Sequence, residues 1–347
     1  MKIGQVRETA RRWVVEEASS IPGFVGAYTA GSTNWLPDDT EMPGPSDLDV
    51  VVAVTDRGLA GGRRKFVHDG VLFDVSLLGA DALRSPEQVM GDSQVGPSFR
   101  TAHILLDPSG HLSSLLEAVR RGFSKRRWIQ ARCDRAGERV LRHLKSIDRQ
   151  ASFPDQVLAC LFAAGVTTHV LLLAGLRNPT VRRRYEAARE LLGDYGRMEF
   201  HETLLGLLGA KHIRRDQAER HLEVLREIFD AAGRVAGPRL PFVGDISESA
   251  RPAAIDGSRE MIKCGLHREA MFWIAVTHSC CQKALTESPA DAMPKGGADR
   301  YRELTYDLGI WRPEEVRRRS EEIERMLPCV RAQAEAIVKA NEEIPES

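Results

Sequence analysis

The sequence lacks a surplus of charge of either sign, because its 347 residues carry 49 Lys and Arg against 49 Asp and Glu. A protein that coats nucleic acid needs a surplus of positive charge, so this class of protein is disfavoured. Cysteines are few, and the six present lack the spacing of a disulfide framework, so we expect reduced thiols. The first residues contain no apolar core of the kind found in signal peptides, and we therefore expect a cytoplasmic protein.

Long apolar runs are also scarce. One stretch, residues 156–176, is free of charge over a length that could span a bilayer, which takes about 20 residues. Its middle contains Thr167, Thr168 and His169, and three consecutive arginines follow at residues 182–184. Polar groups in these positions disfavour a membrane span. We expect a helix buried in the centre of a bundle, and no membrane partner.

The remaining composition is that of a folded protein, with 42% hydrophobic and 28% charged residues. A single core stops growing at roughly 250–300 residues, so we expect more than one domain. The charge is unevenly distributed, because residues 1–110 carry 10 Lys and Arg against 15 Asp and Glu. Either this imbalance is accidental, or some carboxylates of the N-terminal part face cations that are not side chains.

Apolar periodicity changes from that of strands to that of helices near residue 110. Strands are predicted over residues 24–30, 47–54, 64–68, 71–78 and 103–106, and helices over 6–18, 112–123, 128–147, 156–176, 181–192, 217–232, 258–286, 299–306 and 313–340. We therefore predict an α+β protein with a small mixed-sheet domain (1–110), a helical bundle (111–235), an irregular connection (236–257) and C-terminal helices that complete the bundle (258–347).

Three carboxylates are the main candidates for chemistry. Asp47 and Asp49 alternate with apolar residues on one strand, so both point to the same face. Asp74 is the single charge on a hairpin strand that follows the turn Asp69-Gly70. If these strands are neighbours, the three acids would repel one another strongly unless divalent cations lie among them. Oxygen ligands select Mg²⁺ or Mn²⁺, and two such ions form the clamp used in phosphoryl transfer.

A candidate phosphate-binding element precedes these acids. Gly31 and Ser32 end the first predicted strand and are expected to open a helix. Free backbone N–H groups at the start of a helix favour phosphate, and a small residue lets phosphate approach the backbone. The chain therefore offers a phosphate-binding turn, a loop, two paired carboxylates and a third carboxylate, in that order.

In this order and context, Gly31-Ser32, Asp47-Leu48-Asp49 and Asp74 resemble the signature of the polymerase-β-like nucleotidyltransferases. The α/β domain followed by helices is most similar to the antibiotic branch of that superfamily, the kanamycin, lincosamide and streptomycin enzymes. The resemblance implies that Gly31 and Ser32 hold a triphosphate and that Asp47 and Asp49 bind two Mg²⁺ ions. It also implies that Asp74 binds the catalytic metal or takes the proton from an acceptor hydroxyl.

Two features depart from the family pattern. The spacer between Ser32 and Asp47 is long and acidic, and Thr33-Asn34-Trp35 stand where family members often place a basic residue. Lys65, with Arg63 and Arg64, is the candidate substitute for binding the triphosphate, although a basic cluster beside a turn is often simply solvated.

The resemblance implies transfer of a nucleoside monophosphate from ATP or another NTP to a hydroxyl, with release of pyrophosphate. We expect a small-molecule acceptor, and the acidic loop with Asp38, Asp39 and Glu41 suits a cationic, aminoglycoside-like one, which would imply antibiotic resistance. Asp74 has few polar neighbours, so we expect a raised pKa that suits a proton acceptor. A homodimer and a nucleic-acid partner are left open, the latter not favoured.

Two other functions compete with this one. The chain could modify a protein or a tRNA end, as toxin and antitoxin members of the superfamily do, with residues 181–184 as a docking surface. It could instead be a catalytically silent nucleotide-binding module. Arg215 and His221 also match the Arg-x5-His spacing of HEPN ribonucleases, but six residues of a regular helix turn the two side chains about 120° apart. A general base from the helical part is a further alternative, with candidates Glu186, Glu190, Glu199 and Glu202.

Overall fold

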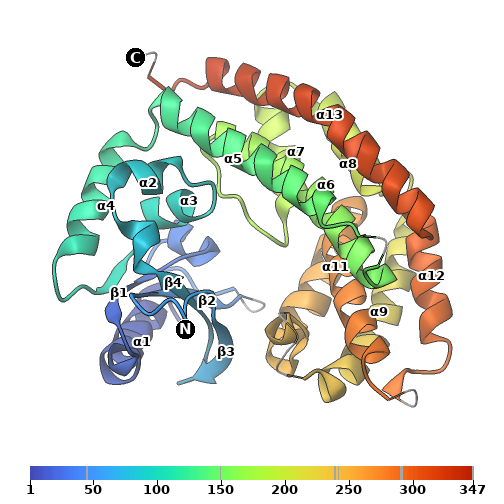
Figure 1. The fold of residues 1–347 in the computed structure, drawn as a ribbon, viewed down its shortest axis with the longest axis horizontal. Coiled ribbons are helices and arrows are strands. Elements are labelled where there is room, and N and C mark those ends of the chain that lie inside the picture. Colours follow the sequence, from blue (N-terminus) through green and yellow to red (C-terminus); the bar gives the residue numbers. More distant parts are fainter. Residues whose placement is uncertain (44–45, 149, 238–239, 241, 290–291, 346–347) are drawn as a thin grey trace. The chain divides into compact units, whose positions relative to one another are not determined.

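The computed structural model describes residues 1–43, 46–148, 150–237, 240, 242–289 and 292–345. The chain forms two compact units, and the first comprises Met1–Arg132 with the C-terminal residues from Glu342 onward (Figure 1). The second unit is Cys133–Asn341. A five-stranded sheet lies in the first unit and the second is helical, so the predicted α+β class is confirmed.

The first unit extends beyond the boundary expected at residue 110. Helix α4 (His111–Gly122) contacts α2 (Pro86–Gly91) and α3 (Val95–Arg100), so it belongs to the unit that contains the sheet. Within the connection expected over 236–257, the structure has short 3₁₀ turns and a π-helical turn, Pro252–Asp256. Residues 238, 239 and 241 of that connection lie outside the described part of the chain.

The sheet has the order β3-β4-β2-β1-β5. Its strands are β1 (Phe24–Thr29), β2 (Leu48–Val54), β3 (Arg63–His68), β4 (Val71–Gly79) and β5 (Ile104–Leu106). The central pair β2 and β4 is parallel, whereas the other neighbours are antiparallel. Parallel pairing places equivalent positions of β2 and β4 side by side, and this register arranges the acids described below.

Alternation along β2 explains why this strand anchors the sheet. Leu48, Val50 and Val52 are fully buried, and they leave the intervening positions on the opposite face. Helix α1 (Ile3–Glu16) covers the buried face through Trp13, whose ring lies 5.5 Å from that of Phe73 on β4. Aromatic contacts of this kind bury a large apolar area and hold the strands in one register.

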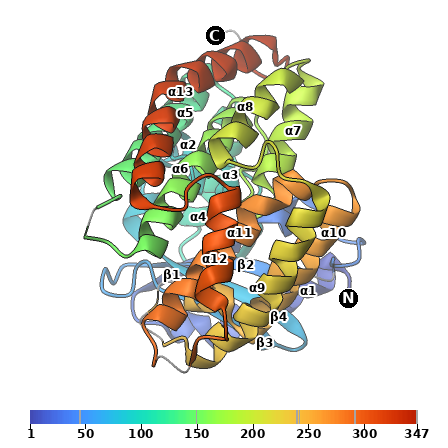
Figure 2. The ribbon, with the colours of Figure 1, turned by 90° about the vertical axis from the view of Figure 1, so that its right-hand side faces the viewer.

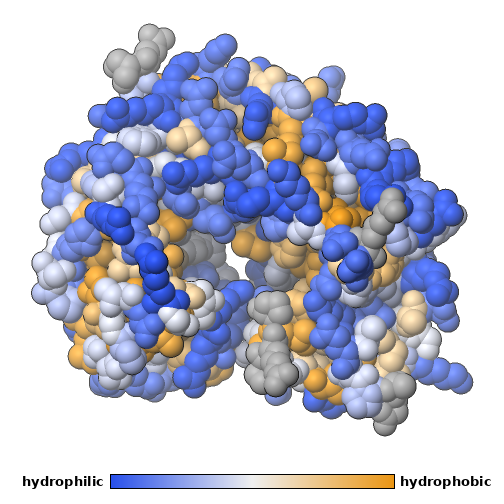
Figure 3. Space-filling model, viewed as in Figure 1, coloured by the Kyte–Doolittle hydropathy of each residue, from blue (hydrophilic) through white to orange (hydrophobic). Residues whose placement is uncertain are grey.

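The second unit is built from long helices. They are the C-terminal part of α5 (Arg126–Lys145), α6 (Phe153–Ala174), α7 (Arg184–Asp194), α8 (Met198–Leu208), α9 (Arg215–Val235), α10 (Gly257–Lys263), α11 (His267–Thr286), α12 (Gly297–Asp307) and α13 (Pro313–Ala340). Helix α11 packs against both α9 and α6 (Figure 2). On the face drawn in Figure 3 most side chains are hydrophilic, as expected when apolar residues fill the core of each unit.

Helix α6 is the one described helix that is long and apolar enough to cross a membrane by length and composition. Of its most apolar window, 94% is buried inside the protein, so the prediction of a central buried helix is confirmed. The helix expected over residues 258–286 is instead two helices, α10 and α11. Gly265 interrupts it with φ +83°, a conformation that favours glycine and ends a helix.

Candidate active site

The first unit brings the three predicted carboxylates to neighbouring positions. Asp47 precedes β2, and Asp49 lies two residues further on the same face of that strand. Asp49 is the register partner of Asp74 in the parallel pairing of β2 with β4. Asp74 is almost fully buried, with 2% of its side chain exposed. The pleat of the strands thus concentrates three acidic groups at one place on the sheet.

Two cations from β3 bind these acids. Lys65 is the register partner of Asp74, and its Nζ lies 2.7 Å from Oδ2 of Asp47 and 3.2 Å from Oδ2 of Asp74. Arg63 donates from Nε to Oδ1 of Asp74 at 2.8 Å and from Nη2 to Oδ2 of the same carboxylate. Bidentate pairing of this kind is the strongest geometry available to a guanidinium and a carboxylate.

The sequence pattern suggested Lys65 as a ligand of a triphosphate and did not lead us to expect this pairing. A signal for it exists, because Arg63 and Lys65 are two residues apart and so point to one face of the hairpin that also carries Asp74. Protein cations therefore reduce part of the repulsion among the acids. Divalent ions are not the only charges that can balance them. Triphosphate binding by Lys65 stays a prediction.

The pKa values of Asp74 and Asp49 are shifted in opposite directions by their surroundings. Burial alone would raise the pKa of Asp74, but hydrogen bonds and charge from Arg63 and Lys65 outweigh it and lower that pKa. The expectation of a raised pKa at Asp74 is therefore wrong, because its polar neighbours come from the adjacent strand. Burial, followed by the negative charges of Asp47 and Asp74, raises the pKa of Asp49 to about 7.

The turn after β1 lies against Asp49. Gly31 has φ +72°, and a Cβ atom at this position would lie 1.8 Å from Oδ2 of Asp49. The backbone N–H of Ala30 donates to the carbonyl of Asp49 at 2.9 Å, which joins the turn to β2. Ser32 is exposed and begins a short 3₁₀ helix, Ser32–Trp35, where the sequence predicted the start of a helix. The turn that is predicted to bind phosphate therefore lies beside the acids.

The loop after this turn is held by the protein's own groups. The side chain of Asn34 donates to the carbonyl of Thr29 at 2.8 Å, which accounts for its presence where a basic residue was expected. Arg7 donates to the carbonyls of Thr33 and Leu36 and also pairs with Asp38. Arg7 thus anchors the loop from α1 and neutralises part of its acidity.

The donor set of the site is suited to a hard divalent cation, because its three carboxylates offer only oxygen ligands. As the side chains stand, no group of three His, Cys, Asp or Glu among the described residues is arranged as a metal site. Asp47 and Asp74 are turned toward Lys65 and Arg63 instead. Metal binding would therefore compete with these ion pairs.

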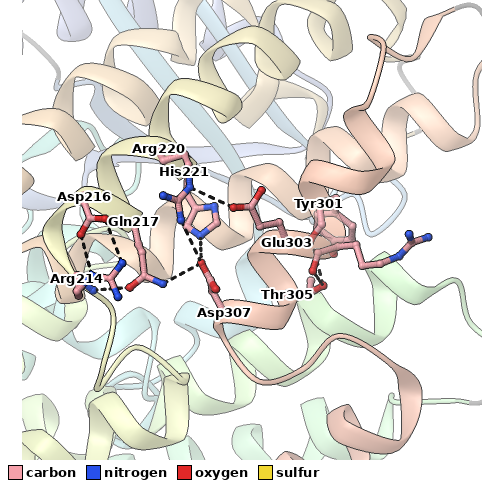
Figure 4. Close-up of polar contacts among 10 residues, drawn as sticks. Arg214, Asp216, Gln217, Arg220, His221, Tyr301, Glu303, Thr305 and Asp307 are labelled. Atoms are coloured by element: carbon pink, nitrogen blue, oxygen red, sulfur yellow. Dashed lines mark hydrogen bonds and ion pairs between the residues drawn. The ribbon is translucent and has the colours of Figure 1, made fainter.

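The Arg-x5-His pattern of the helical unit does not form a site. His221 lies 2.8 Å from Oδ2 of Asp307 through Nε2, beside Gln217 and Arg220 (Figure 4). Arg215 donates to Glu219 at 2.9 Å along the surface of α9 instead. The two residues of the pattern therefore face different partners, as the helical geometry predicted.

The arginine run is not a free docking surface. Arg184 is buried with 2% exposure, Arg183 pairs with Glu186, and Arg182 donates to the carbonyl of Ala253 at 2.8 Å. Docking of a partner on residues 181–184 would therefore have to displace contacts that the run already makes within the protein.

The four candidate bases of the helical part are either paired or exposed. Glu186 has Arg183 as its partner, and Glu202 forms two hydrogen bonds of 2.9 Å with Arg268. Glu190 and Glu199 are exposed. None of these contacts singles out one glutamate as a general base.

Comparisons with known proteins add little to this geometry. No protein-family model matches the chain, and no curated protein matches it. Among solved structures, a nucleotidyltransferase-like protein from Exiguobacterium sibiricum 255-15 is 13% identical, with 88% of this chain and 89% of that chain covered and a TM-score of 0.32. A likeness this low carries no argument about function.

Replacing Gly31 by Ala should destabilise the first unit for two reasons, the positive φ and the overlap with Asp49. Gly61 is the matched control, because it has φ +88° and no atom lies within 4 Å of the position that a Cβ would take there. We expect Gly61→Ala to lower the free energy of unfolding by about 1 kcal/mol, the cost of the left-handed conformation alone. Gly31→Ala should cost clearly more in urea unfolding, and equal losses would refute the contact with Asp49.

The raised pKa of Asp49 predicts a pH dependence of stability. Between pH 3.8, the usual pKa of the group, and about 7, the folded state keeps a proton that the unfolded state loses. The free energy of unfolding therefore falls as pH rises through this window, by at most about 1.4 kcal/mol per pH unit from this group. Asp49→Asn should remove this contribution, so its stability relative to wild type should grow from pH 4 to pH 7 in urea unfolding with EDTA. A difference that does not change with pH would contradict the assignment.

Proposed function

We propose that this protein is a metal-dependent nucleotidyltransferase that moves a nucleoside monophosphate from ATP or another NTP to a hydroxyl and releases pyrophosphate. The proposal is carried by one observation, the placement of Asp49 beside Asp74 on parallel strands with Gly31 directly against Asp49. The order of these residues along the chain also resembles the polymerase-β-like signature. The nearer resemblance to the antibiotic branch depends on sequence pattern alone.

In this proposal Asp47 and Asp49 hold Mg²⁺ or Mn²⁺, with Asp74 beside them. The ions would neutralise the triphosphate and lower the pKa of the acceptor hydroxyl. Gly31 leaves the backbone of the turn open to a phosphate, because it has no side chain. Exposed Ser32 offers a hydroxyl and a backbone N–H at the same turn.

The ion pairs on β3 decide the role of Asp74. A carboxylate whose pKa is lowered is a weak proton acceptor, so Arg63 and Lys65 favour Asp74 as an ionised ligand rather than as the general base. Lys65 would also balance part of the negative charge of the acids before a metal ion binds, because its ammonium group contacts Asp47 and Asp74. We therefore propose Lys65 as a counter-ion of the acids in addition to its expected contact with phosphate.

The charges of the acidic loop bear on the nature of the acceptor. Two of the three acids that favoured a cationic acceptor have partners, because Asp38 pairs with Arg7 and Glu41 lies 2.8 Å from the N-terminal amine. An aminoglycoside-like acceptor therefore loses part of its electrostatic support. Docking of RNA or protein on residues 181–184 loses support as well, because Arg184 is buried. We retain a small-molecule hydroxyl as the acceptor.

A catalytically silent nucleotide-binding module is the second candidate. The observation that favours it is the occupation of the acids by Lys65 and Arg63, which can replace divalent cations as the balancing charge. A silent module would bind nucleotide without consuming it, so turnover distinguishes the two functions.

The test is incorporation of label from each of four α-labelled NTPs with Mg²⁺, against a panel of aminoglycosides and total tRNA. Asp49→Asn should lower turnover at least about 100-fold, because it removes a ligand that stabilises transition-state charge. Asp69→Asn is the control, since Asp69 is an exposed acid in the hairpin turn where φ is +48° and Asn is tolerated.

Equal turnover by wild type and Asp49→Asn would refute the two-metal site. Nucleotide binding without any transfer would favour the silent module. Transfer to tRNA but not to small molecules would replace the proposed acceptor and leave the chemistry intact.

A further inference from the structure

A buried guanidinium in the second unit has no counter-ion among the described residues. Arg184, the first residue of α7, has 2% of its surface exposed. Its Nε donates to the carbonyl of Val181 at 2.7 Å, whereas its buried Nη1 has no hydrogen-bond partner. The guanidinium lies over the ring of Phe272 at 4.1 Å. Leaving a buried charged donor unsatisfied is costly, so this group calls for a ligand or a compensating charge.

Helix α6 makes room for this group. A Cβ atom on Gly165, in the middle of α6, would lie 2.6 Å from Nη1 of Arg184. Glycine in the interior of a helix costs about 1 kcal/mol relative to alanine. Glycine at position 165 therefore weakens the helix but avoids a clash with the guanidinium of Arg184.

Further cationic or titratable groups surround this position. Nη2 of Arg139 on α5 donates to Nδ1 of His169 at 2.7 Å, and Nε2 of His169 donates to the carbonyl of Thr180 at 2.9 Å. With one nitrogen accepting and the other donating, His169 is neutral. Its ring therefore orients Arg139 without adding a charge of its own.

His143 is linked to the ring under Arg184 through a chain of aromatic contacts. Its ring stacks on Phe162 at 5.7 Å, and Phe162 meets the edge of Phe272 at 6.3 Å. The guanidinium of Arg184 lies over this ring of Phe272. We call Arg139, His143, His169 and Arg184 the cationic cluster.

Burial and neighbouring charges lower two pKa values within the cluster. Burial, with a contribution from Arg139, lowers the pKa of Arg184 to about 9. Burial and then the charges of Arg139, Arg184 and Arg142 lower the pKa of His143 to about 4. Burial disfavours the charged form of both groups, and the neighbouring arginines add to that effect.

We propose that the cationic cluster is a binding site for a phosphate-type oxyanion, with Arg184 and Arg139 as its guanidinium donors and His143 at its edge. Guanidinium groups match the geometry of phosphate oxygens and are weakly hydrated, so they suit a buried phosphate site. The exposed Arg142, next to His143 on α5, provides attraction from solvent. The proposal goes beyond the proposed nucleotidyl transfer, because the cluster belongs to the second unit and contains none of the acids.

The experiment is calorimetric titration of the full chain with pyrophosphate and, separately, orthophosphate, at constant ionic strength and with EDTA present. Wild type should bind one anion, and Arg184→Met should weaken binding at least about tenfold. His143→Gln, at a half-buried position, should weaken it too and serves if Arg184→Met does not fold. Arg226→Gln is the control, because Arg226 is a half-exposed arginine that pairs with Glu223 on α9. Its affinity should remain within about twofold of wild type.

Loss of anion binding in Arg184→Met assigns the anion to the second unit, because Arg184 belongs to that unit and the acids of the proposed catalytic site do not. Tighter binding of pyrophosphate than of orthophosphate would assign the cluster to a diphosphate group, and similar binding would assign it to a single phosphoryl group. Absence of binding by wild type at millimolar anion would overturn the proposal. So would unchanged affinity in folded Arg184→Met or in His143→Gln.

Discussion

The parallel pairing of β2 with β4 places the carboxylates of Asp49 and Asp74 at adjacent positions, and the rest of the first unit's site responds to their repulsion. Lys65 and Arg63 on the next strand supply positive charge, which lowers the pKa of Asp74. At Asp49 these cations do not offset burial and the negative charges of the neighbouring acids, which raise its pKa to about 7. A bound cation would favour the ionised form of this carboxyl group, because it would offset the neighbouring negative charges.

Much of this arrangement was predictable from the sequence, because strands with period-two alternation and a clear hairpin turn leave little choice of face. The shared face of Asp47 and Asp49 and the buried helix α6 follow directly from pattern. The lowered pKa of Asp74 could not be predicted from this pattern, because it depends on the cations of β3. Pairing between strands is a tertiary contact. The break at Gly265 could not be predicted, because a single glycine within a helical pattern can be tolerated or can end the helix.

The two units manage buried charge in different ways. In the first, three acids are partly balanced by protein cations. In the second, Arg184 is held by an aromatic ring and a backbone carbonyl, with no carboxylate among the described residues as its partner. Replacing buried charges by apolar packing of similar volume is often neutral or stabilising, so neither arrangement is evidence of added stability. We propose a ligand for each of them, a divalent cation in the first unit and an oxyanion in the second.

The central claim is that the acids of β2 and β4 form a divalent-cation site, and binding of Mn²⁺ followed by electron paramagnetic resonance tests it without requiring a substrate. Wild type should bind Mn²⁺, Asp49→Asn should lose that binding, and Asp69→Asn should retain it. Lys65→Met should bind Mn²⁺ more tightly, because the ammonium group that competes for Asp47 and Asp74 is gone. Equal Mn²⁺ binding by wild type and Asp49→Asn would contradict the account.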